Sequence, residues 1–281
     1  MTILKKIKKQ EKSILDNNNI NLQKKQLGSS ETTRVISYTT DQLIHADYLA
    51  GLIDGDGSIS ISKNSPLSIE ITLHQEDVKT LYKLRSLLGF GLVRARVNSK
   101  AYRIRFNKKE DVKKIIHLIN GKLKSSQKQV QHAVCCKLLN ITPLPYDRKG
   151  NLNNSLAENG WFSGFFDAEG YFSIRNKYTL TLSVGQKDPA LLVLIRDGFG
   201  CGNIYYDKSW NGYNYCITDR SGIKKVLQYF SLFPLLTVKN VDRVTFQRLV
   251  LFLDRKYHWK SSPHKAKIDR LIQVFRNRKK I

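Results

Sequence analysis

The chain has 281 residues, and its 48 Lys and Arg outnumber its 23 Asp and Glu to give a formal net charge of +25. Hydrophobic residues at 41% and aromatic residues at 10% suffice for a packed core, which excludes a mainly disordered chain. No apolar run approaches the roughly 18 residues of a membrane span, and the charge indicates a polyanionic partner, either nucleic acid or an anionic membrane.

The first 140 residues divide into a tail and a patterned unit. Residues 1–40 carry eight Lys or Arg against three acids and predict a flexible basic tail. Residues 41–140 begin with a predicted helix that runs from an Asp41 N-cap to Gly57. The elements expected after it are strands at 58–62 and 68–74, a helix over 78–88, strands near 92–97 and 101–106, and helices near 109–119 and 127–139.

A stretch rich in proline and asparagine at 141–155 predicts a linker, and residues 156–281 follow the same order of elements. Strands are expected near 171–175 and 179–184, a helix over 189–197, strands near 203–207 and 213–218, and then helices. The stretch from Arg255 to Ile281 has ten basic residues and one acid and predicts a basic helix and tail. Such a helix would attract phosphates irrespective of sequence, although a merely solvated helix stays an alternative.

The two halves of the ordered part repeat each other. The segment Leu49–Gly57 aligns without gaps on Phe162–Gly170, and Gly-Phe-Gly recurs at 89–91 and 198–200. Several matches in one order indicate a domain-sized duplication, because the period of about 110 residues is too long for a solenoid. The predicted fold class is α+β, with two pseudo-symmetric αββαββα repeats that each contain a four-stranded antiparallel sheet.

One face of each predicted sheet is polar. In 93–97 and 102–106 arginines alternate with apolar residues, and they would repel one another unless a polyanion lay against them. Arginine also suits bidentate contact with guanine edges and phosphates, so we predict a DNA-binding face, with an ordinary solvated face as the alternative. Its members in the first repeat are Ser58, Ser60, Ser62, Glu70, Thr72, Arg94, Arg96, Arg103 and Arg105. Those in the less charged second repeat are Tyr171, Ser173, Arg175, Thr179, Thr181, Ser183, Asn203, Tyr205 and Asn214.

Each copy of the duplicated helix ends in an acidic residue. Gly51 and Gly55 lie four apart on the first helix, a spacing of small residues that lets two helix backbones pack closely, and the second copy matches it. If the copies pack about a pseudo-twofold axis, Asp56 and Glu169 come together beside the negative ends of two helix dipoles. Divalent cations would stabilise that arrangement, and two such ions can promote phosphodiester hydrolysis. The alternative is that each acid simply ends a helix before a strand.

The nonapeptide at 49–57 resembles the motif that names the LAGLIDADG homing endonucleases, with Gly55 in place of alanine. The segment Phe162–Gly170 resembles a diverged copy in which Glu169 is the acid. The resemblance covers residues 41–260 and includes the duplication, so it indicates the single-chain, two-motif branch of the family. It implies a pseudo-symmetric monomer whose two sheets form a saddle over the major groove of a long, imperfectly palindromic DNA site.

The resemblance also implies roles for individual residues. Asp56 and Glu169 would hold Mg²⁺ with help from the backbone carbonyls of Gly55 and Ala168. Mn²⁺ would substitute, whereas Ca²⁺ would bind without supporting cleavage. Glutamines that order water and basic residues near the scissile phosphate complete the implied catalytic set: Gln75, Gln186, Lys124 and Lys239.

The remaining polar residues carry less information. Lys122 and Lys128 compete with Lys124 for its role, whereas Asp54 and Asp167 are expected to be structural, at the helix interface or at a cap. The six histidines form no HNH-like pattern. The four cysteines show no zinc-ligand spacing, which favours a reducing compartment, and the first residues do not resemble a secretion signal.

The resemblance predicts a Mg²⁺-dependent, site-specific endonuclease that cuts one phosphodiester in each strand of double-stranded DNA and so promotes mobility of its host intron. An RNA maturase that binds intron RNA is the first alternative, and a DNA-binding regulator without catalysis is the second. Membrane binding comes last, because the basic residues lie on alternating strands. The many Lys, Asn and Ile residues suit an AT-rich organelle genome, which favours the mitochondrion over the chloroplast.

Overall fold

The computed structural model describes residues 40–62, 65–146 and 156–278, and the side chains in these ranges except those of 40–45, 62, 65 and 66. The predicted tail before residue 40 and the linker residues 147–155 lie outside the described residues. No helix in the described ranges is long and apolar enough to cross a membrane.

The first repeat has the predicted order of helices and strands, with two helices at its end. Its elements are α2 (Thr40–Asp56), β1 (Gly57–Ser62), β2 (Ser65–His74), α3 (Val78–Leu88), β3 (Leu92–Ala95), β4 (Ala101–Phe106), α4 (Lys109–Leu118) and α5 (Ser126–Leu138).

The second repeat follows the same order and ends with three helices. Its elements are α6 (Trp161–Glu169), β5 (Gly170–Arg175), β6 (Thr179–Gln186), α7 (Pro189–Phe199), β7 (Asn203–Asp207), β8 (Gly212–Ile217), α8 (Arg220–Leu232), α9 (Lys239–Asp254) and α10 (Lys265–Arg278).

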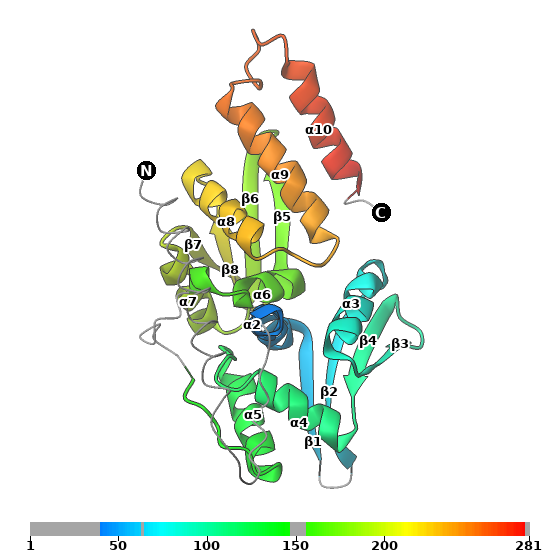
Figure 1. Ribbon diagram of the computed structural model, residues 1–281. Helices are drawn as coiled ribbons and strands as arrows, with labels where there is room; N and C mark the ends of the chain where they lie inside the picture. The colour runs from blue at the N-terminus through cyan, green and yellow to red at the C-terminus, as the bar shows by residue number, and fades with distance from the viewer. Residues whose placement is uncertain (1–39, 63–64, 147–155, 279–281) are drawn as a thin grey trace, which may run out of the picture. The chain divides into compact units, whose positions relative to one another are not determined.

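Each repeat forms one four-stranded antiparallel sheet, which confirms the predicted α+β fold (Figure 1). The strand orders are β1-β2-β4-β3 and β5-β6-β8-β7. Alternation buries one side of each strand, as with Ile71 and Ile104 in the first sheet. In the second sheet, Phe172 packs against Phe230 of α8 and Phe246 of α9. The helices therefore cover the apolar face of each sheet, and most of the side chains on the opposite, polar face are exposed or half-exposed.

Helices α2 and α6 pack side by side between the two sheets (Figure 1). A Cβ atom on Gly51 would stand 1.9 Å from the carbonyl oxygen of Trp161, and one on Gly164 would stand 1.9 Å from that of Tyr48. These glycines let the two backbones touch, as their spacing predicts. A Cβ on Gly55 would stand 2.3 Å from the Cβ of Ala168, so alanine at position 55 would collide with the partner helix.

Some element boundaries differ from the sequence prediction. Asp41 lies inside α2, so its predicted role as the N-cap is wrong. Strand β3 ends at Ala95, because the chain turns through Asn98, whose φ is 56°. Arg96 therefore follows the strand, although its backbone N–H still bonds to the Ala101 carbonyl.

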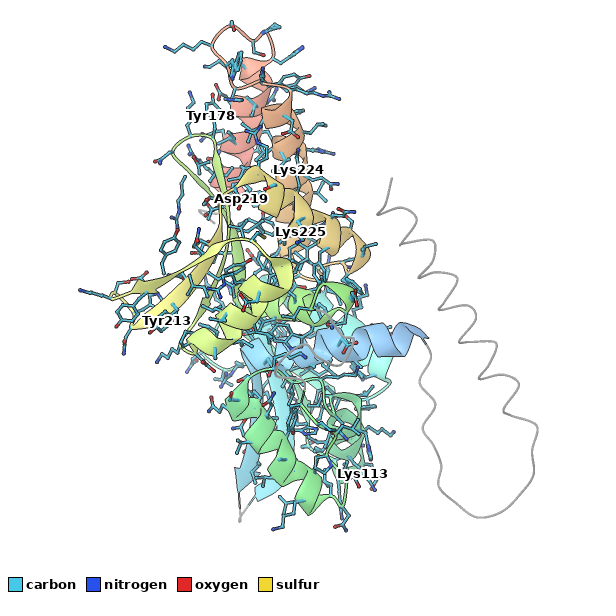
Figure 2. The ribbon with its side chains drawn as sticks, turned by 90° about the vertical axis from the view of Figure 1, so that its left-hand side faces the viewer. Lys113, Tyr178, Tyr213, Asp219, Lys224 and Lys225 are labelled. Carbon is cyan, nitrogen blue, oxygen red and sulfur yellow. The ribbon has the colours of Figure 1, made fainter. Side chains whose placement is uncertain are left out.

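The predicted basic helix near the end of the chain is α10, which packs on α9. Its apolar side is buried, and the ring of Phe275 lies 5.4 Å from that of Phe246 on α9. Tyr178 lies in the β5–β6 turn (Figure 2). Its hydroxyl donates a hydrogen bond of 2.6 Å to Asp269 of this helix. The helix is thus an integral part of the second repeat.

Candidate active site and nucleic-acid interface

The duplicated motif places two acidic residues at the neighbouring ends of α2 and α6. Asp56 is the last residue of α2, and Glu169 is the last residue of α6. Burial raises the pKa of the Asp56 carboxyl to about 6, against the attraction of Lys239. Burial also raises the pKa of Glu169, and the negative charge of Asp56 adds to the shift. The fold therefore brings the two predicted acids into one partly desolvated site.

Lys239 brings positive charge to this site. Its Nζ donates to the carbonyl oxygens of Phe166, Asp167 and Ala168 at 3.1, 2.7 and 3.1 Å. These carbonyls belong to the last turn of α6, where the helix dipole favours a cation. The ammonium also lies near enough to Asp56 to lower the pKa of that carboxyl. The Ala168 carbonyl, predicted as a ligand for a divalent ion, is thus already oriented toward a positive charge.

Lys124 does not occupy the position that corresponds to Lys239. The backbone N–H of Lys124 donates to Asp54 at 2.7 Å, and that of Leu236 donates to Asp167 at the same distance. Since Asp54 and Asp167 are equivalent positions of the motif, Lys124 corresponds to Leu236, three residues before Lys239. The sequence alignment of the two lysines is therefore wrong by three residues.

The two lysines that competed with Lys124 both have partners. The Nζ of Lys122 donates to Asp47 at 2.8 Å. The Nζ of Lys128 donates to the carbonyl of Gly57, directly after the first motif's acid. The ammonium of Lys128 therefore contacts the end of the first motif.

The two predicted glutamines also lie at unequal positions. Gln186 donates from Nε2 to the Glu169 carboxylate at 3.5 Å. Gln75 has an exposed side chain. The last glycine of each motif pairs with Ile71 in the first sheet and with Val184 in the second. Gln75 lies four residues after Ile71, whereas Gln186 lies two residues after Val184. The structure thus brings Gln186, but not Gln75, against a predicted metal-binding acid.

Asp54 and Asp167 join the two repeats, which confirms their predicted structural role. The indole N–H of Trp161 donates to Asp54 at 2.8 Å, and the hydroxyl of Tyr48 donates to Asp167 at 2.7 Å. Each acid thus accepts a bond from the other repeat. Burial raises the pKa of Asp54 to about 7, against the pull of its hydrogen bonds.

Sequence reasoning missed a second connection between the repeats. Asp77 accepts a bond of 2.7 Å from the backbone N–H of Val238, and the Thr80 hydroxyl donates at 2.7 Å to the Leu236 carbonyl. Asp77 stands at the N-cap position of α3 but makes no side-chain bond to that helix. A local pattern assigns such an acid to its own helix, so nothing in the sequence pointed to this distant partner. The contacts hold the segment that leads into Lys239.

The polar side of the first sheet, which we call the first polar face, carries an ion pair. Thr72 pairs with Arg103 and Arg103 with Arg94 across three strands. The Arg103 guanidinium lies 3.0 Å from the Glu70 carboxylate, so an acid does accompany these arginines. The other predicted residues whose side chains are described here are Ser58, Ser60, Arg96 and Arg105, all exposed. The predicted side chain of Ser62 lies outside the described ones.

The polar side of the second sheet, the second polar face, is nearly neutral. Thr181 and Ser183 are 0% and 1% exposed, so these two predicted contacts are covered in the free protein. The predicted residues with exposed or half-exposed side chains are Tyr171, Arg175, Thr179, Asn203, Tyr205 and Asn214. Ser173 is half-exposed as a residue, but its hydroxyl is buried. Sequence reasoning missed Trp210, whose ring lies over Gly185 and Gly212 on this face. The signal available in the sequence was the pair Gly185 and Gly212, which have no side chains and so leave room for the ring of a nearby tryptophan.

Asp56 and Glu169 are the acidic residues of this site that could hold a divalent cation. Within the described ranges, no group of three or more His, Cys, Asp or Glu side chains is placed to hold a metal ion. Mg²⁺ is typically bound through one or two carboxylates together with waters and substrate phosphates. Asp56 and Glu169 match that donor set, and the raised pKa of each reflects the cost of desolvating two neighbouring negative charges.

Comparison with known proteins identifies the family. The family model described as LAGLIDADG endonuclease matches residues 49–139 and 162–250, which are the two structural repeats. The chain therefore belongs to the LAGLIDADG endonuclease family, in its single-chain, two-motif form.

Its curated relatives are intron-encoded proteins. The chain is 40% identical over 182 residues to the intron-encoded RNA maturase bI4 of Saccharomyces cerevisiae, which covers 63% of this chain and 27% of that protein. It is 31% identical over 258 residues to an uncharacterized cox1 intron-2 protein of Schizosaccharomyces pombe, covering 82% and 77%. It is 33% identical over 211 residues to the probable intron-encoded endonuclease aI2 of Debaryomyces hansenii, covering 68% and 31%. The chain thus spans less than a third of two of these three relatives.

Solved structures share the fold. The LAGLIDADG meganuclease I-AabMI, bound to uncleaved DNA, is 22% identical with a TM-score of 0.63, and the match covers 81% of this chain and 98% of that one. The LAGLIDADG homing endonuclease I-GzeII, in complex with its DNA target, is 19% identical with a TM-score of 0.60, covering 81% and 97%.

Proposed function

We propose that the chain is a site-specific endonuclease that cuts double-stranded DNA and serves the mobility of an intron. The observation that carries this proposal is the meeting of Asp56 and Glu169, one from each repeat, between two sheets with polar faces. A net charge of +25 supports a nucleic-acid partner, and several relatives are named as intron-encoded endonucleases.

The site supports hydrolysis of one phosphodiester in each strand. Mg²⁺, held by Asp56, Glu169 and the carbonyls of Gly55 and Ala168, would supply Lewis-acid stabilisation of the attacking and leaving oxygens, with Mn²⁺ as a substitute and Ca²⁺ as a non-catalytic ligand. Lys239 adds positive charge where negative charge grows on the phosphate. Gln186, Gln75 and Lys124 are the other predicted catalytic residues, and Gln186 is bonded to an acid of the site.

The DNA target would be long and pseudo-palindromic. The two repeats carry similar sheets about the α2–α6 pair, so each sheet would contact one half of the site. Since one chain supplies both acids and both sheets, the protein would act as a monomer.

The test is cleavage of a duplex DNA library containing candidate intron-insertion sequences. Discrete double-strand cuts with Mg²⁺ or Mn²⁺, and specific binding without cuts in Ca²⁺, are expected. Specific DNA binding without cleavage in any of these metals would instead identify a regulator.

RNA maturation is the second candidate function. It is favoured by the 40% identity to a protein named as an intron-encoded RNA maturase. Tight binding of intron RNA, without specific binding of any DNA in the library, would replace the endonuclease proposal with this one. Binding of both would indicate a dual function.

We also propose an organellar location, with the mitochondrion favoured over the chloroplast. A composition rich in Lys, Asn and Ile and a relative named for a cox1 intron support it. Fractionation of the source cells, with immunodetection of the chain in purified organelles, tests this proposal.

A further inference from the structure

Arg103 in the first sheet and Asn214 in the second occupy equivalent positions. Thr72 and Gly185 are equivalent positions, since each directly follows the residue that pairs with the last glycine of its motif. Their partners on the adjacent inner strand are Arg103 on β4 and Asn214 on β8. These two side chains therefore lie at symmetry-related positions of the first and second polar faces.

Arg103 is held by a carboxylate. Its Nη1 lies 3.0 and 3.4 Å from the two Glu70 oxygens, and the side chains of Arg103 and Glu70 are 33% and 18% exposed. The carboxylate holds the Nη1 end of the guanidinium and offsets its positive charge, so attraction for phosphate in general is weakened. The remaining N–H groups keep their direction. A guanidinium in this state favours a fixed pair of acceptors, such as O6 and N7 of guanine.

Asn214 is also held by a carboxylate, that of Asp207 on β7, whereas Glu70 lies on β2. Its Nδ2 donates to Asp207 at 3.3 Å, and because a carboxylate only accepts, this bond fixes which end of the amide is the nitrogen. Bonds from Ser209 hold the pKa of Asp207 below its ordinary value. One amide N–H and the amide oxygen are left, the pair that matches N7 and N6 of adenine.

Aromatic rings stand beside Asn214. Tyr205, its partner on β7, is 56% exposed, and Trp210 is 37% exposed with its ring over Gly185. The thymine of an A·T pair presents a methyl group in the major groove, which favours apolar neighbours. The corresponding partner of Arg103 on β3 is Arg94, a cation that offers no such surface.

Resting on the proposed endonuclease function, we propose that Arg103 and Asn214 make the two halves of the target unequal. Arg103, set by Glu70, specifies guanine in the half contacted by the first sheet. Asn214, set by Asp207 and flanked by Tyr205 and Trp210, specifies adenine at the symmetry-related position of the other half.

The test is selection from a duplex DNA library randomised across one long window, by binding in Ca²⁺ and by cleavage in Mg²⁺. The wild-type chain is expected to enrich guanine at one position and adenine at its mirror position. Arg103→Asn should replace guanine by adenine at the first position, and Asn214→Arg should do the reverse at the second. Each change should alter preference at its own position by about tenfold or more and leave the other half unchanged.

Two matched variants separate base preference from charge. Arg85→Asn removes the same charge as Arg103→Asn from an exposed residue of α3, and it should weaken binding to all sequences alike. Glu70→Gln should weaken the guanine preference, because the guanidinium loses its fixed orientation. Glu110→Gln, an exposed change of the same charge on α4, should leave every base preference intact.

The outcomes divide clearly. Shifts confined to the two predicted positions support the proposal. Specific selection in which Arg103→Asn behaves like Arg85→Asn overturns it, since Arg103 would then contact only phosphate, while the endonuclease function would stand. No enriched sequence under either condition overturns this proposal and the proposed function together.

Discussion

In the first repeat, Gly51 lies against the carbonyl of Trp161, and in the second, Gly164 lies against the carbonyl of Tyr48. In both cases an added Cβ atom would stand 1.9 Å from the carbonyl oxygen. Where the repeats touch each other, their geometry is thus nearly the same. Where they face outward, they differ: the first polar face carries several arginines, and the second carries tyrosines, two asparagines, a tryptophan and a single arginine. Close packing allows only one arrangement at the interface, whereas the outward-facing residues are free of that constraint and differ between the repeats.

The same contrast holds inside the candidate site. Both repeats end their motif helix with an acid, but Lys124 corresponds to Leu236 and not to Lys239. One predicted glutamine, Gln186, contacts an acid, while the other, Gln75, is exposed. The shared element is the one fixed by helix packing. Substitutions at the helix interface, at the buried acids, at Asp77 and on α5 should show how far this symmetry extends, with effects that decrease in that order.

The symmetry of the interface predicts that Gly51→Val and Gly164→Val are equally damaging. Each side chain would enter a partner backbone 1.9 Å away, at a cost of about 4 kcal/mol or more. Soluble yield and thermal melting measure the effect. Gly89→Ala is the control, since open space surrounds that position and only its φ of 77° opposes the change, at about 1 kcal/mol. A tolerated Gly164→Val would refute the close helix contact.

The two buried acids, Asp54 and Asp167, should contribute unequally to stability although they occupy equivalent positions. Asp167 accepts from Tyr48, Leu236 and Thr237, including the Thr237 hydroxyl, whereas Asp54 accepts from Trp161 and two backbone N–H groups. Asparagine would set an N–H₂ group against these donors. We expect Asp167→Asn to lower the free energy of unfolding by about 3 kcal/mol and Asp54→Asn by somewhat less. Denaturant titration of each variant checks the order, and equal stability with wild type would contradict it.

Asp77 is expected to affect catalysis in only one repeat. Asp77→Ala frees the segment before Lys239, so cleavage of one strand should slow about tenfold while DNA binding persists. Nicked DNA should then accumulate in single-turnover assays. Asp77→Asn keeps an acceptor for the Val238 N–H and should restore most of the rate. Asp188→Ala, at the equivalent cap of α7, should reduce stability without strand bias.

The smallest effect is expected on α5. Helix α9 is covered by α10, but α5 leaves Val130, Val134 and Leu138 at 63%, 41% and 59% exposed. Val130→Gln should therefore change the free energy of unfolding by less than about 0.5 kcal/mol. Chemical denaturation measures this. A loss above about 1 kcal/mol would show that the stripe is covered in solution.

The sequence predicted the features that depend on regular patterns. Alternating strands, amphipathic helices and the repeated motif led to the α+β repeats and to the meeting of Asp56 and Glu169. The sequence comparison was wrong where the repeats differ in length. The chain between the paired residues of β6 and β8 is two residues shorter than that between β2 and β4, so Gln75 and Gln186 are not equivalent positions. Sequence reasoning also missed Asp77 and Trp210, whose partners are set by tertiary packing and not by neighbouring residues.

The most direct test of the central claim is strand-resolved cleavage of the selected DNA site in Mg²⁺ by wild type, Asp56→Asn and Glu169→Gln. If the two acids form one site shared by the repeats, wild type cuts both strands, and each variant binds the DNA in Ca²⁺ but loses double-strand cleavage. Full double-strand cleavage by either variant would contradict the account.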